Sequence, residues 1–99
     1  MSVATEEDVV TEPTDGTTTD NLPKVIVFND NVHTFDDVIN QVIKANAAVG
    51  VSMTQEQGEA IAMEVHTRGK AVAYGGEMEK CIIVSGILEE ILLNTQIEV

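Results

Sequence analysis

The stretch KVIVFND, residues 24–30, combines a run of apolar residues with two polar residues that follow it directly. Its apolar, largely β-branched run predicts a short buried strand from Lys24 to Asn29. Asn29 and Asp30 follow that run, and both side chains are well suited to a turn. The same pair also offers an amide oxygen and a carboxylate to a ligand. The stretch therefore places hydrogen-bond acceptors at the edge of an apolar element.

The segment before this strand has a different composition. Residues 1–22 contain six acidic residues, no Lys or Arg, and only scattered apolar residues. Such a segment cannot bury enough surface to offset its ordering entropy, so we expect a disordered acidic tail (1–22) ahead of one folded domain (23–99). The net charge of −12 disfavours nucleic acid as a partner. With neither a signal peptide nor a membrane-spanning run, we expect no membrane partner and a cytoplasmic location.

Capping residues and apolar spacing predict three helices after the first strand. Thr34 is suited to cap a helix that runs to about Ala48, and Thr54 with Gln57 matches a capping box for a second helix that ends at Gly69. A strand over 70–74, a third helix from residue 77 and a last strand within 92–99 follow. This β-α-α-β-α-β order predicts an α+β two-layer domain, with three helices packed on a small, mainly antiparallel three-stranded sheet.

Apolar residues on the second and third helices indicate which faces turn inward. We expect the second helix to bury Ala60, Ile61, Met63 and Val65. We expect the third to bury Cys81, Val84, Ile87, Leu88 and Ile91. Cys81 stands in an apolar run and is interpreted as a core thiol.

Three side chains at the ends of apolar elements suit one kind of ligand. A buried ammonium group has three donors and needs acceptors, and Asn29, Asp30 and a neutral His66 supply them. Each also has an ordinary role, the first two in a turn and His66 as a cap at a helix end. His33, His66 and Cys81 fit no common zinc spacing, and no nucleophile–base set is visible. We therefore expect a binding protein that uses no metal or cofactor and is not an enzyme.

Two longer motifs carry a family resemblance. VIVFNDNVHTF at 25–35 and MEVHTRGKA at 63–71 occur in the order found in the ClpS family, and the chain resembles these adaptors of the bacterial Clp protease over residues 23–99. The resemblance implies recognition of N-degrons, here proteins that begin with Leu, Phe, Tyr or Trp. It also implies delivery of these substrates to a Clp AAA+ unfoldase of the ClpA or ClpC type.

The resemblance also implies roles for individual residues. Asn29, Asp30 and His66 would hold the α-amino group of the substrate, and Asn31 stands where the family often has an acid that contacts the peptide backbone. The hydrophobic pocket would comprise His33, Phe35, Val38, Ala62, Val65 and Ile97. Departures from the family pattern at Asn31, His33, Phe35 and Ala62 leave an alternative open, a non-catalytic domain that docks on the Clp ATPase and modulates it without binding N-degrons.

Overall fold

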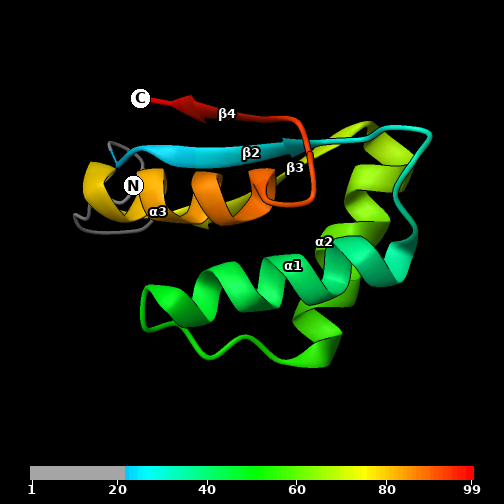
Figure 1. The fold of residues 1–99 in the computed structure, drawn as a ribbon, viewed down its shortest axis with the longest axis horizontal. Helices are drawn as coiled ribbons and strands as arrows, with labels where there is room; N and C mark the ends of the chain where they lie inside the picture. The colour runs from blue at the N-terminus through cyan, green and yellow to red at the C-terminus, as the bar shows by residue number, and fades with distance from the viewer. Residues whose placement is uncertain (1–21) are drawn as a thin grey trace, which may run out of the picture.

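The computed structural model describes residues 22–99, so the predicted tail lies outside the described residues except for Leu22. The elements are β2 (Lys24–Phe28), α1 (Phe35–Ala48), α2 (Gln55–Arg68), β3 (Lys70–Gly75), α3 (Met78–Glu89) and β4 (Thr95–Glu98). Figure 1 shows their arrangement. The predicted α+β class and the β-α-α-β-α-β order are confirmed.

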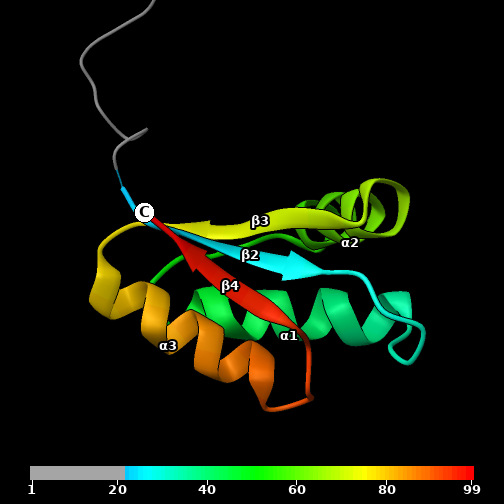
Figure 2. The same cartoon turned by 90° about the horizontal axis from the view of Figure 1, so that it is seen from above.

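The sheet has β2 at its centre. Its strand order is β3-β2-β4, and both pairings are antiparallel. Figure 2 shows α1 and α3 on one side of this sheet. Phe28, at the end of β2, lies opposite Lys70 at the start of β3. This register brings the turn after β2 beside the end of α2, because α2 runs directly into β3.

The first two helices begin where the sequence predicts. Thr34 and Thr54 each accept a hydrogen bond from the backbone N–H three residues on, and the side chains of Asp37 and Gln57 accept from the cap residues in return. These reciprocal bonds satisfy backbone donors that the first helical turn leaves unpaired. Gly69 ends α2 with φ +88°, a left-handed conformation that glycine adopts without steric cost.

The core lies between the sheet and the helices. Val25, Val27, Val42, Val84 and Leu88 are fully buried within it. Cys81 is also fully buried, as expected of a core thiol. Ile87 and Ile91, expected inward, are partly buried against the same cluster.

The predicted inward face of α2 is wrong at two positions. Ala60 and Met63 are exposed, and the buried residues are Gly58, Ala62 and Val65, whose spacing of four and three follows the helical repeat. A Cβ at position 58 would lie 3.1 Å from Cγ2 of Ile39. Glycine therefore lets α1 and α2 approach closely, which explains a residue otherwise unfavourable inside a helix.

Candidate functional site

A cavity of about 300 Å³ lies where the turn after β2 meets the start of α1 and the last turns of α2. It is lined by Asn29, Asp30, Asn31, His33, Thr34, Phe35, Val38, Ala62, Val65 and His66. A volume of this size is at the lower end of small-molecule sites in proteins. Every residue assigned to the amine site and the backbone contact lines this cavity, as do five of the six assigned to the pocket.

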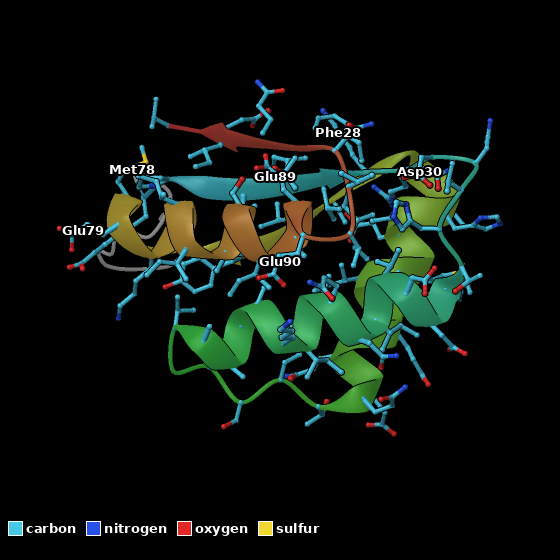
Figure 3. All side chains as sticks on the ribbon, viewed as in Figure 1. Phe28, Asp30, Met78, Glu79, Glu89 and Glu90 are labelled. Atoms are coloured by element: carbon cyan, nitrogen blue, oxygen red, sulfur yellow. The ribbon has the colours of Figure 1, made fainter. Side chains whose placement is uncertain are left out.

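Backbone hydrogen bonds hold the two sides of the cavity together. The N–H of Asn29 donates to the carbonyl of Gly69 at 2.9 Å, and the N–H of Gly69 donates to the carbonyl of Val65 at 2.9 Å. The end of β2 is therefore tied to the last turn of α2, which carries His66. In Figure 3, Asp30 lies beyond the end of β2 and close to the end of α2.

The cavity has a polar rim and an apolar floor. Asn29 and His66 are exposed at the rim, whereas Val38, Ala62 and Val65 are buried below them. Phe35 also lines the cavity and is exposed, and its ring meets that of His66 edge to face, with centroids 5.4 Å apart and an interplanar angle of 76°. Such contacts are favourable and restrict ring orientation. The arrangement suits a ligand with a polar head and an apolar side chain.

Asp30 already has partners within its own turn. One carboxylate oxygen, Oδ1, accepts from the backbone N–H of Val32 at 3.0 Å and of His33 at 2.9 Å. The other, Oδ2, lies 2.6 Å from Nδ1 of His33. These bonds, led by the one from the His33 backbone, hold the pKa of Asp30 below its ordinary value, against a smaller opposing effect of burial. The turn role anticipated for Asp30 is therefore present alongside any ligand role.

The resemblance assigns His33 to the hydrophobic pocket, and the structure adds polar contacts of its ring to that assignment. His33 lines the cavity, and its ring acts as a polar bridge, with Nδ1 on Asp30 and Nε2 on the backbone carbonyl of Ile91. The Ile91 carbonyl, followed by the Asp30 side chain, raises the pKa of His33. No local pattern reveals the contact with Ile91, 58 positions away. Thr34 also lines the cavity, although its sequence context indicated only a helix cap.

Ile97 lies away from the cavity. It stands on β4 opposite Val25, near the start of β2, whereas the cavity begins where β2 ends. Its side chain packs partly buried against the core. The antiparallel register of β4 therefore separates Ile97 from the other predicted pocket residues.

A second, wider hollow of about 540 Å³ is lined by Ile26, Ala71 and Val72 together with charged side chains. Its two acids, Glu64 and Glu98, are balanced by Arg68 and Lys70, so its lining has no net formal charge to attract a cation. No cluster of three or more His, Cys, Asp or Glu side chains suited to a metal ion occurs within residues 22–99. No helix in that range is long and apolar enough to cross a membrane.

Fold and cavity together define a small α+β domain with a polar-rimmed apolar cavity. A family model described as ATP-dependent Clp protease adaptor protein ClpS matches residues 18–91, and the chain belongs to the ClpS family. Among solved structures it is similar to Agrobacterium tumefaciens ClpS2 bound to L-phenylalaninamide, with a TM-score of 0.68 and 19% identity over 78% of this chain and 94% of that one. No curated protein matches.

Proposed function

We propose that this adaptor binds the free α-amino group and the bulky hydrophobic side chain of N-degron substrates, and delivers them to a Clp AAA+ unfoldase. The observation that carries the proposal is the placement of Asn29, Asp30 and His66 at the rim of one cavity with a buried apolar floor. The related ClpS2 is bound to L-phenylalaninamide, which carries both a free amine and an aromatic side chain.

Each part of such a substrate has a counterpart in the cavity. The ammonium donates to the Asn29 amide oxygen, the Asp30 carboxylate and a neutral His66 nitrogen, and bonds to charged partners of this kind are the stronger ones. The first side chain, Leu, Phe, Tyr or Trp, enters over Val38, Ala62 and Val65, beside Phe35. Asn31 lines the cavity and is exposed, and in this proposal it contacts the peptide backbone as the chain leaves the site.

Delivery requires a second surface that stays accessible while the cavity is occupied. The outer side of α3 exposes Met78, Ile82 and Ile83, the last two about half exposed. Met78 lies at the opposite end of the molecule from Asp30 in Figure 3. We assign unfoldase docking, to a ClpA- or ClpC-type partner, to this face of α3. The variant Ile82→Ser is expected to weaken binding to the unfoldase and to leave peptide affinity unchanged.

Calorimetry with two peptides that differ only at the amino terminus tests the amine site. A Phe-initiated peptide with a free terminus should bind at least about tenfold more tightly than its N-acetylated twin, because acetylation removes the charge-assisted bonds. Asn29→Ala and His66→Ala should remove most of that preference. Asn40→Ala, exposed on α1 and outside the cavity lining, is the matched control and should retain it. Equal affinity for the two peptides would refute the proposal.

One observation favours a second candidate, a docking domain that binds the Clp ATPase without N-degrons. The Asp30 carboxylate is already engaged at both oxygens, by two backbone N–H groups and by His33. A site whose only charged acceptor is occupied is a weaker amine binder. Retained binding to the unfoldase, with no affinity for any free-amine peptide, would establish this second candidate in place of the first.

A further inference from the structure

The ring of His33 joins two loops that are distant in sequence. Nδ1 lies 2.6 Å from Oδ2 of Asp30 in the turn after β2, and Nε2 meets the carbonyl of Ile91 in the connection between α3 and β4. The two side chains of the pair are largely shielded from water, with 11% of His33 and 18% of Asp30 exposed. The contacts are therefore built into the folded structure rather than formed at a free surface.

Both partners of the ring can only accept hydrogen bonds. An ionised carboxylate and a backbone carbonyl have no proton to donate, so each ring nitrogen must carry its own. A neutral imidazole has one N–H, and it would leave one of the two contacts with lone pairs facing each other. The geometry is satisfied only by the doubly protonated imidazolium. In that protonation state the free site holds a cation of its own, bound to the carboxylate that an incoming ammonium requires.

We propose that His33 is a proton-linked positioning residue of the amine site: its imidazolium holds Asp30 in the free protein, and an α-ammonium that binds Asp30 displaces the proton from His33 to solvent. The inference rests on the proposed function and adds the regulation of its site by pH. The peptide keeps its charge, and neutral His33 keeps one hydrogen bond, either to Asp30 or to Ile91. Binding therefore exchanges one positive charge beside Asp30 for another.

The other groups around His33 define how its charge is balanced. Asp30 contacts the ring directly, and Asp37 on α1 acts on it through its charge. From α2, His66 lines the same cavity, and the connection from α3 contributes the uncharged Ile91 carbonyl. The two carboxylates favour the imidazolium in the free protein. An added ammonium at the shared carboxylate opposes it, because like charges at close range disfavour each other.

Histidine titration by NMR tests this coupling directly, since the chain contains only two histidines, His33 and His66. Their ring signals are assigned with one single-site variant each, and both titration curves are then recorded without and with a Phe-initiated peptide amide. In the free protein we expect the pKa of His33 to lie above the ordinary value of 6.5. Saturation with the peptide should lower it by about one unit. The N-acetylated peptide should leave it unchanged.

Affinity measured against pH provides the second readout. His33→Asn keeps a side-chain donor beside Asp30 and removes the charge. Relative to this variant, the unmodified protein should bind the free-amine peptide progressively better as pH rises from 6 to 8, by up to about tenfold, the factor that one pKa unit represents. Comparison at each pH cancels the titration of the peptide's own amine.

The outcomes separate this inference from the function on which it rests. Tight binding of the free-amine peptide with an unshifted His33 titration overturns the coupling alone. Failure of the protein to bind either peptide removes the proposed function, and the coupling with it. If His33→Asn does not fold, the titration still decides between these outcomes. It is recorded on the unmodified protein, and a His66 variant alone assigns both ring signals, because the chain has only two histidines.

Discussion

Replacing Asp30 by Asn tests, in the absence of a ligand, the hydrogen bonds that Asp30 makes within the turn after β2. Asn retains an Oδ1 acceptor for the N–H groups of Val32 and His33, whereas its NH₂ group replaces the Oδ2 that faces Nδ1 of His33. The substitution therefore removes one charge-assisted bond and leaves the two backbone bonds in place. Asp30→Ala removes all three acceptor contacts and therefore gives the upper limit of the loss in free energy of unfolding.

The expected size follows from the number and kind of bonds lost. A hydrogen bond to a charged group contributes about 1.5–3 kcal/mol, and partial exposure of both side chains reduces it. We expect Asp30→Asn to lower the free energy of unfolding by about 1–2 kcal/mol at pH 5.5. Asp30→Ala should lower it by about 3–4 kcal/mol, because each of the two further backbone bonds contributes about 1 kcal/mol. Urea denaturation followed by circular dichroism measures both.

The effect of Asp30→Asn on the free energy of unfolding should depend on pH if Asp30 and His33 form an ion pair. The pKa of Asp30 lies below its ordinary 3.8 in the folded protein, so its stabilisation is present above that value and is lost as pH falls through the folded pKa. The pKa of His33 lies above its ordinary 6.5, so its stabilisation is complete below 6.5 and is lost as pH rises through the folded pKa. The Asp30→Asn difference should therefore be largest between about pH 4 and 6.5. A difference of equal size at pH 5.5 and pH 9 would refute the ion pair.

Three further substitutions test the helices and the cavity floor. Thr54→Ala removes the capping box of α2 and should lower the free energy of unfolding by about 1 kcal/mol, with no loss if the cap is dispensable. Gly69→Ala forces a Cβ onto a residue with φ +88° and should cost about 1 kcal/mol by the same urea measurement; an unchanged midpoint would contradict the left-handed cap. Ala62→Leu fills the cavity floor and should weaken a Trp-initiated peptide more than a Leu-initiated one in calorimetry, whereas equal losses would place the first side chain elsewhere.

Features that depend on neighbouring residues in the chain were predictable. Thr34, Thr54 and Gly69 mark helix ends because caps are local, and all three act there. The apolar run over 24–28 forms the central strand for the same reason. Asn29 and His66, each at the end of a recognisable element, line the same cavity, and their role as acceptors stays a prediction.

Features that depend on long-range packing were not predictable in the same way. The inward face of α2 includes Gly58, whose role exists only because α1 crosses it closely. His33 meets the carbonyl of Ile91 through folding of the connection after α3, and a backbone carbonyl leaves no mark in a sequence. Ile97 is removed from the cavity by strand register, which alternation alone does not determine.

Chemical-shift mapping with L-phenylalaninamide tests most directly whether this cavity binds a free amine with a bulky side chain. We predict that the largest changes in backbone amide signals fall within residues 29–35 and 62–66, which line or adjoin the cavity. N-acetyl-L-phenylalaninamide at the same concentration should cause little change there. Equal changes with both compounds, or changes concentrated on the exposed face of α3 at Ile82 and Ile83, would contradict the assignment.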